Sequence, residues 1–133
     1  MVMKLELDNV RDILLDFEKN LQYNEYISVK ELDSRAKTLN ITKSDYLYTI
    51  DKLAEDSIID VIYGTGKLKD HIFYVKSITS KGHKFLDNIR KEDVWSKTKS
   101  IAKKLGTVSL SHIDKIAEGV ITTLITKTIS GEL

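Results

Sequence analysis

The stretch "SIIDVIYGTGKLKDHIFYVKSITSKGHKF", residues 57–85, decides the fold because its pattern changes from strand to turn, to strand, and then to helix. Residues 57–64 and 71–78 are rich in β-branched and aromatic side chains, which is typical of strands. The glycines of "GTGK" between them can adopt positive φ in a hairpin turn. Thr79 then suits the N-cap of a helix. These residues predict a β-hairpin that leads directly into a helix.

The pair Gly82-His83 in this stretch allows two interpretations. A chemical interpretation makes His83 a base or a metal ligand. The other histidines, His71 and His112, are far away in sequence and form no short metal-binding spacing with it. A structural interpretation places Gly82 in the first turn of the helix, where a Cβ would collide with a neighbouring helix or with the hairpin. We favour the structural interpretation.

Three helices are predicted before the hairpin. Asp8 can cap the first helix, about residues 8–21. "SVKE" at 28–31 fits a capping box and opens a short second helix that stops near Asn40. Thr42 can cap the third helix. Its expected apolar stripe consists of Leu47, Ile50, Leu53 and Ala54.

Further helices are predicted after the hairpin. A break near Lys91 separates the helix that Thr79 caps from a basic helix ending at Leu105. Gly106 suits the left-handed position that often follows a helix. A last helix starts at Ser109 or Ser111 and carries a broad apolar face.

This order of elements predicts a mainly α fold with a small β-hairpin, namely a winged helix-turn-helix with a C-terminal helical extension. The winged-helix domain would span residues 1–90. Residues 91–133 would form the extension within the same compact domain and would serve dimerisation. The second and third helices would be the helix-turn-helix pair, and "GTGKLKD" would be the wing. Such a fold does not by itself define a function.

The composition indicates one globular domain in a reducing compartment. The chain has 133 residues, of which 41% are hydrophobic and 31% charged. It has no cysteine, which excludes disulfides, thiolate metal sites and cysteine nucleophiles. The N-terminal residues do not resemble a signal peptide, and the apolar tract at 120–129 is too short and polar to span a bilayer. We therefore expect a cytoplasmic protein without membrane contact.

The charge is distributed unevenly along the chain. Residues 1–60 carry 8 Lys+Arg and 13 Asp+Glu, whereas residues 61–133 carry 13 and 7. The basic half could bind phosphates, or it could neutralise the acidic half of the same molecule or of a partner. The run "KTKSIAKK" at 97–104 is one candidate for phosphate contact, although such runs are usually solvated helix faces.

Three strings resemble a known family. They are "LDNVRDILLDFE" at 7–18, "ITSKGHKFLDNIRKEDVWSKTKSIAKKLG" at 78–106 and "VSLSHIDKIAEGVI" at 108–121. The family occurs in Gram-positive bacteria and their phages and is known only as domain of unknown function number twenty-five thirteen. "ITSKGHKFL" is also similar to the join after the wing in many winged-helix regulators. The resemblance implies a winged-helix fold and a phage or prophage setting, and it supplies no catalytic residues.

Candidate DNA-binding residues follow from the predicted fold. Outward positions of the third helix and lysines of the wing tip could contact bases and phosphates; they are Ser44, Tyr48, Thr49, Lys52, Lys67 and Lys69. One observation opposes this prediction. Residues 42–57 contain 2 lysines and 4 acidic residues, a net charge of −2, which is unfavourable for a helix that enters a polyanion.

The apolar face of the last helix is a candidate partner-binding surface. Its face is wider than one helix needs to pack on a small domain, so we expect packing on the first helix or a two-fold dimer contact. The residues predicted for the dimer or partner interface are Ile116, Val120, Ile121, Leu124 and Ile125.

The sequence thus predicts a non-enzymatic protein with no catalytic residue, metal or cofactor. "GTGK" does not match a phosphate-binding loop, because one residue separates its glycines and leucine follows its lysine. The leading hypothesis is a phage-type transcriptional regulator that binds double-stranded DNA as a homodimer. The alternative is a module of phage or prophage origin that binds a host or phage protein without touching DNA.

Overall fold

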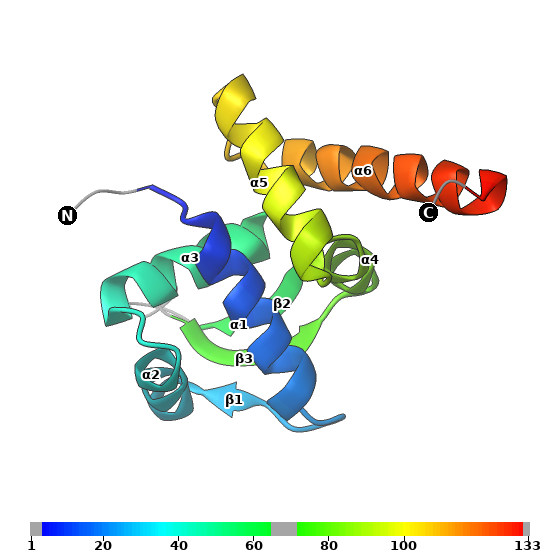
Figure 1. The fold of residues 1–133 in the computed structure, drawn as a ribbon. Coiled ribbons are helices and arrows are strands. Elements are labelled where there is room, and N and C mark those ends of the chain that lie inside the picture. The colour runs from blue at the N-terminus through cyan, green and yellow to red at the C-terminus, as the bar shows by residue number, and fades with distance from the viewer. Residues whose placement is uncertain (1–3, 65–71, 132–133) are drawn as a thin grey trace. The chain divides into compact units, whose positions relative to one another are not determined.

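The computed structural model describes residues 4–64 and 72–131, which form a mainly helical protein with one small antiparallel sheet (Figure 1). The predicted helices and the two predicted strands occur in the expected order, with one short additional strand between the first two helices. The elements are α1 (Leu7–Asn20), β1 (Ile27–Ser28), α2 (Val29–Thr38), α3 (Lys43–Glu55), β2 (Ile59–Tyr63), β3 (Ile72–Ile78), α4 (Ser80–Ile89), α5 (Glu92–Leu105) and α6 (Leu110–Ser130).

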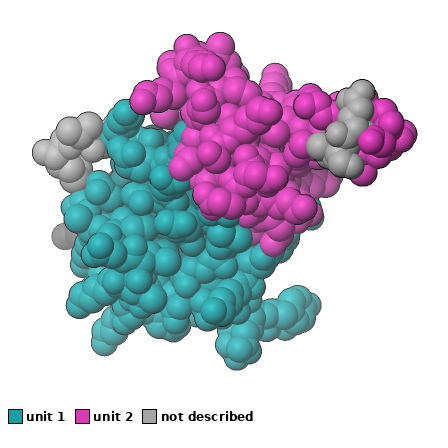
Figure 2. All heavy atoms as spheres, viewed as in Figure 1, with its two compact units in different colours: residues 1–83 teal, residues 84–133 magenta. Residues whose placement is uncertain are grey.

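The chain divides into two compact units, residues 1–83 and 84–133 (Figure 2). The sequence suggested a boundary after residue 90, where a helix was expected to end. The structural division falls inside α4, so this helix contributes residues to both units. We describe each unit by itself.

The helices of the first unit bury regular apolar stripes. On α1, one face is fully buried, since Val10, Ile13, Leu14 and Phe17 recur every three or four residues. On α3, the buried face consists of Tyr46, Thr49, Ile50 and Leu53. α1 and α3 contact each other, so these two stripes contribute to one core.

Side-chain caps fix where α2 and α3 begin. The backbone N–H of Glu31 donates to Ser28 Oγ at 3.4 Å, and that of Asp45 donates to Thr42 Oγ1 at 3.2 Å. Each bond satisfies an amide that the first turn leaves without a helical partner. Residues 39–42 connect the two helices, and Asn40 in this connection adopts φ +56°, a left-handed conformation that asparagine tolerates. Both caps confirm the sequence prediction.

The sheet has the strand order β1-β3-β2, with both pairs antiparallel. β2 and β3 are the strands that the sequence predicted. β1 is an addition, because the sequence predicted no strand between the first two helices. Ile27 pairs with Val75 and Ser28 with Tyr74. A strand of two residues is too short to produce an alternating pattern, so its position depends on β3.

The join between β3 and α4 confirms the structural interpretation of Gly82. The backbone N–H of Gly82 donates to Thr79 Oγ1 at 2.9 Å, so Thr79 caps α4. The Thr79 hydroxyl is also 2.5 Å from the carbonyl oxygen of Ser57 and 3.0 Å from that of Ile58. A Cβ on Gly82 would collide with the Ile58 carbonyl and lie 2.8 Å from Ile78 Cγ2. The closely packed neighbours are therefore the residue just before β2 and the last residue of β3.

The second unit is built mainly from α5 and α6, which pack together. The predicted break is present, because α4 ends at Ile89 and α5 begins at Glu92. Gly106 follows α5 with φ +69°, as its left-handed position requires. The buried faces of the two helices consist of Val94, Trp95, Thr98 and Ala102 on α5, and Leu110, Ile113, Ala117 and Val120 on α6.

Candidate nucleic-acid interface

Three of the predicted contact residues on α3 are accessible to different degrees. Ser44 is exposed at the start of the helix, and Tyr48 and Lys52 are half-buried one and two turns later. The Lys52 ammonium lies 5.4 Å from the centroid of the Tyr48 ring, within the range of a cation–π contact. These residues occupy one outer face of α3.

The prediction that Thr49 faces outward is wrong. Thr49 is only 2% exposed, and its hydroxyl donates to the Asp45 carbonyl oxygen at 2.7 Å. Its position is explained by the buried stripe, since Tyr46, Thr49, Ile50 and Leu53 have the spacing i, i+3, i+4, i+7. The predicted stripe correctly included Ile50 and Leu53, which are buried, but it completed the face with Leu47 and Ala54, which are only half-buried.

Both lysines of α3 lie beside carboxylates. Lys52 Nζ is 3.1 Å from Glu55 Oε2, and Lys43 Nζ is 3.7 Å from Asp33 Oδ1 on α2. The hydrogen bond to Glu55, together with its charge, raises the pKa of Lys52. A phosphate that approached Lys52 would have to compete with this carboxylate. The pairing therefore weakens the positive potential that DNA binding would require of α3.

Asp51 is held against the sheet. The hydroxyl of Tyr63, on β2, donates to Asp51 Oδ1 at 3.1 Å. Burial, then the charge of Asp51 and this hydrogen bond, raise the pKa of Tyr63 to about 12. The contact links the middle of α3 to β2.

A polar contact joins α1 and α2, and its charges act on a buried tyrosine of α3. Arg35 Nη1, on α2, donates to Asp16 Oδ1, on α1, at 3.2 Å. Tyr46 of α3 is 1% exposed, and neither its hydroxyl nor Asp16 Oδ2 has a hydrogen-bond partner among the described residues. Burial, followed by the charge of Asp16, raises the pKa of Tyr46. Leaving a buried hydroxyl unpaired costs about 1–3 kcal/mol.

The predicted wing lysines, Lys67 and Lys69, lie outside the described residues. The two strands that lead into and out of this segment are described, and they pair antiparallel.

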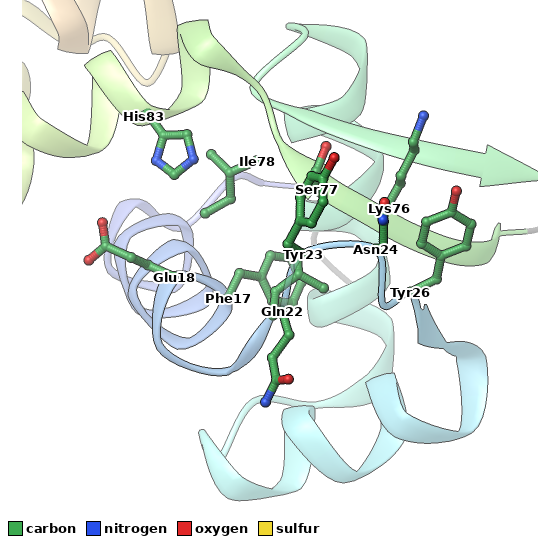
Figure 3. A pocket seen from close by; sticks show the side chains of 11 residues that line it. Phe17, Glu18, Gln22, Tyr23, Asn24, Tyr26, Lys76, Ser77, Ile78 and His83 are labelled. Atoms are coloured by element: carbon green, nitrogen blue, oxygen red, sulfur yellow. The ribbon is translucent and has the colours of Figure 1, made fainter.

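His83 lines a cavity of about 330 Å³ in the first unit. Phe17 and Ile78 are apolar members of its lining, and Figure 3 shows the imidazole of His83 and the carboxylate of Glu18 at one end, with Lys76 at the other. His83 is exposed. No nucleophilic cysteine exists in the chain, and the described residues contain no group of three or more side chains that could hold a metal.

The predicted interface on α6 is partly covered. Val120 is 8% exposed, so its side chain is already buried and is not open to a partner, contrary to prediction. Ile116, Ile121 and Leu124 are half-buried, and Ile125 is 52% exposed. Ile121, Leu124 and Ile125 line a groove of about 430 Å³ together with Asp87, Asn88, Arg90, Lys91, Val94, Thr128 and Ile129.

The apolar stripe of α6 therefore changes its surroundings along the helix. It is buried from Leu110 to Val120, and it continues past that point with increasing exposure until Ile129 is 81% exposed. Figure 1 shows this second half of α6 extending beyond α5. Among the described helices, none is long and apolar enough to cross a membrane.

These features define a mainly helical protein with a small three-stranded sheet, a largely charge-paired α3 and an open apolar stripe on α6. The chain belongs to the family described as "Hypothetical protein (DUF2513)", whose model matches residues 4–109. The resemblance seen in the sequence is thereby confirmed, and the match ends just before α6. Comparisons with curated proteins and with solved structures each found no match.

Proposed function

We propose that this protein is a non-enzymatic winged-helix regulator of phage type that binds double-stranded DNA as a homodimer in the cytoplasm. The observation that carries the proposal is the order α1-β1-α2-α3-β2-β3 with the sheet order β1-β3-β2. A helix pair followed by an antiparallel hairpin is the arrangement in which a helix-turn-helix acquires a wing.

The connection between α2 and α3 supports a helix-turn-helix pair. It contains four residues, 39–42, a length typical of this motif. Asn40 supplies a left-handed residue where glycine is often found. The Ile41 N–H donates to the Ala36 carbonyl oxygen at 2.9 Å, which closes the end of α2. In this arrangement α3 would be the recognition helix, with Ser44, Tyr48 and Lys52 toward the major groove and Lys67 and Lys69 at the backbone.

The open half of α6 supports a dimer. An apolar stripe that includes Leu124 and Ile125 would be covered if a second copy placed the same stripe against it across a two-fold axis. Burying an isoleucine or leucine contributes roughly 1.5–3 kcal/mol. Analytical ultracentrifugation tests this step: the wild type should sediment as a dimer, and Leu124→Asp/Ile125→Asp as a folded monomer. A monomeric wild type at about 100 μM, where a Kd of 1 μM would leave nearly all chains paired, would remove the dimer from the proposal.

The charge of α3 supports the alternative function, in which the same scaffold binds a host or phage protein without DNA. Lys52 is paired with Glu55, and Lys43 with Asp33, so α3 offers little free positive charge. Tyr48, half-buried beside Lys52, is a residue type that is enriched in protein interfaces.

One titration decides between the two functions. Fluorescence anisotropy with a labelled random-sequence duplex at about 50 mM salt is the most permissive test, because counterion release strengthens phosphate contacts as salt falls. The regulator should bind, and its affinity should fall steeply toward 200 mM salt. The alternative function is correct if no duplex is bound at low salt and an affinity pull-down from host or phage lysate recovers one stoichiometric partner protein. The binding of this partner must depend on Tyr48.

A further inference from the structure

The C-terminal half of α5 carries a basic face that the proposed recognition helix lacks. Residues 94–113 contain four lysines and no acidic residue. Lys97, Lys103 and Lys104 are exposed, as are Ser96 and Ser100 between them. With 100° per residue, Lys97 and Lys104 project within about 20° of each other, two turns apart. We call the set Ser96, Lys97, Ser100, Lys103 and Lys104 the α5 basic face.

Within residues 4–64 and 72–131, no carboxylate neutralises the cations of this face. Among residues 4–64 and 72–131, none of Lys97, Lys103 and Lys104 forms an ion pair. Asp93, one turn before Lys97, accepts a hydrogen bond from the N–H of Val94 at 2.9 Å at the start of the helix. In the described part of the chain these three ammonium groups thus lack a carboxylate partner, in contrast to both lysines of α3.

Helix stability explains only part of this pattern. Lys103 and Lys104 lie in the last turn, where a cation stabilises the helix dipole by about 0.3–1 kcal/mol. Lys97 lies nearer the start of α5, where the dipole gives a cation no advantage. Lys99 differs from the others, since its ammonium lies 5.7 Å from the ring centroid of the buried Trp95. Lys97 is thus the exposed cation that helix stability does not explain, and it projects in the same direction as Lys104.

The chemistry of the face favours a nucleic-acid backbone over a membrane. Lys97 and Lys104 are about 10.5 Å apart along the helix axis, at 1.5 Å per residue. That length covers about three phosphates of one DNA strand, which are about 3.4 Å apart along the duplex axis. Serine hydroxyls such as those of Ser96 and Ser100 also donate to phosphate oxygens. A helix lying on a membrane needs an apolar stripe beside its lysines. On α5, Val94, Trp95 and Ala102 are buried and Ile101 is half-buried, so Leu105, 67% exposed, is too little apolar surface to form such a stripe.

We infer that the α5 basic face binds the phosphate backbone of duplex DNA without reading its sequence, and that it supplies more of the salt-sensitive affinity than α3 does. This inference rests on the proposed DNA-binding function and deepens it by naming the surface that holds the polyanion. Lysine contacts of this kind position a protein on DNA and carry no base information. Discrimination between sequences would remain with other residues.

The test uses the full chain and two labelled duplexes of about 20 base pairs with unrelated sequences. Binding is measured by anisotropy between 50 and 200 mM salt for the wild type and Lys97→Gln/Lys104→Gln. Two variants act as controls: Lys97→Arg/Lys104→Arg keeps the charge, and Lys4→Gln/Lys19→Gln removes the same charge from exposed residues of the first unit. Circular dichroism verifies that each variant is folded.

The inference predicts that Lys97→Gln/Lys104→Gln binds both duplexes at least 10-fold more weakly at 100 mM salt. The slope of log K against log salt should also become shallower by about 1.8, or 0.9 for each lost contact. Both controls should keep the wild-type slope. Equal binding by wild type and the Gln variant overturns the inference and leaves the DNA-binding function intact. A wild type that binds phosphatidylserine vesicles and no duplex at 50 mM salt overturns both.

Discussion

α3 and α5 are similar in length, at 13 and 14 residues, and they differ in how their charges are used. α3 follows a capped turn, contacts α1 and β2, and has both of its lysines beside carboxylates. α5 has three lysines without an ion pair among the described residues. The position of α3 in the fold therefore suggests a recognition helix, whereas the charge of α5 is better suited to binding a polyanion.

This difference shows that topology and electrostatics must be considered separately. Position in the fold determines which helix a groove could receive, whereas free positive charge determines where a phosphate backbone is held. In this protein the two properties lie in different compact units, residues 1–83 and 84–133. Substitutions at the Gly82 join, in the charges of α3 and in its hydrogen bonds can therefore test these properties one at a time.

The largest effect should come from the close contact at Gly82. Gly82→Ala introduces a Cβ that collides with the Ile58 carbonyl, so the backbone must move, at a cost of about 3 kcal/mol. Chemical denaturation measures this loss. The matched control is Gly119→Ala in α6, where no atom lies within 4 Å of the new Cβ and alanine should raise the free energy of unfolding by about 0.5–1 kcal/mol. Equal stabilities of the two variants would contradict this account of the join.

Removing the carboxylate beside Lys52 should give α3 a lysine without an ion pair, as α5 has. Glu55→Gln removes the carboxylate 3.1 Å from Lys52 Nζ and lowers the negative charge of the helix. We expect duplex affinity at 100 mM salt to rise several-fold, with a salt slope steeper by up to 0.9 if Lys52 gains a phosphate contact. Glu118→Gln, on the exposed surface of α6, is the charge-matched control. An unchanged affinity would show that α3 does not approach the duplex backbone through Lys52.

Two tyrosines around α3 should respond differently to the same substitution. Tyr63→Phe loses the hydrogen bond to Asp51 and should reduce the free energy of unfolding by about 1 kcal/mol. Tyr46→Phe removes a buried hydroxyl without a partner among the described residues, so stability should stay equal or rise by about 1 kcal/mol. Urea denaturation of both variants checks the pair, and a larger loss for Tyr46→Phe would contradict the assignment.

The pH dependence of Tyr63 follows from its raised pKa. Its pKa is about 12 in the folded protein and 10.0 ordinarily, so the folded state favours the neutral phenol. The stabilising contribution is fully present below pH 10 and is lost as the pH rises from 10 through 12. The stability difference between wild type and Tyr63→Phe should therefore shrink over this interval in urea titrations. A difference that grows there would reverse the assigned direction of the shift.

The smallest effect is expected at His83. His83 is exposed and its side chain lies at the edge of a cavity, so His83→Ala should change the free energy of unfolding by less than about 0.5 kcal/mol. Duplex binding should also remain unchanged. A folded His83→Ala protein that has lost binding would return His83 to the candidate functional residues.

Local interactions explain most of what the sequence predicted. Ser28, Thr42 and Thr79 each cap an amide three residues ahead, and such contacts are visible in a short window. Gly82 was predicted to be closely packed, and its neighbours, Ile58 and Ile78, are now known. The caps depend on spacing within a few residues, and the close packing at Gly82 depends on a residue without a side chain.

Long-range contacts explain what the sequence did not predict. β1 is two residues long and exists through its pairing with β3, almost 50 positions away. The pairing of Lys43 with Asp33 depends on how α2 meets α3. Thr49 is a different case, because the spacing of the buried residues of α3 was present in the sequence. Its burial was not predicted because the buried face was assigned to neighbouring positions of the helix. The candidate site was therefore less predictable than the fold.

The most direct test is lysine footprinting of the full chain, by reductive methylation, with and without a saturating 20-base-pair duplex at 50 mM salt. This measurement compares α3 and α5 in the same sample. We predict that duplex protects Lys97 and Lys104 strongly and Lys43 and Lys52 weakly, while Lys19 reacts equally in both states. Protection of Lys43 and Lys52 with unchanged reactivity at Lys97 and Lys104 would contradict the claim that α5 holds the phosphate backbone.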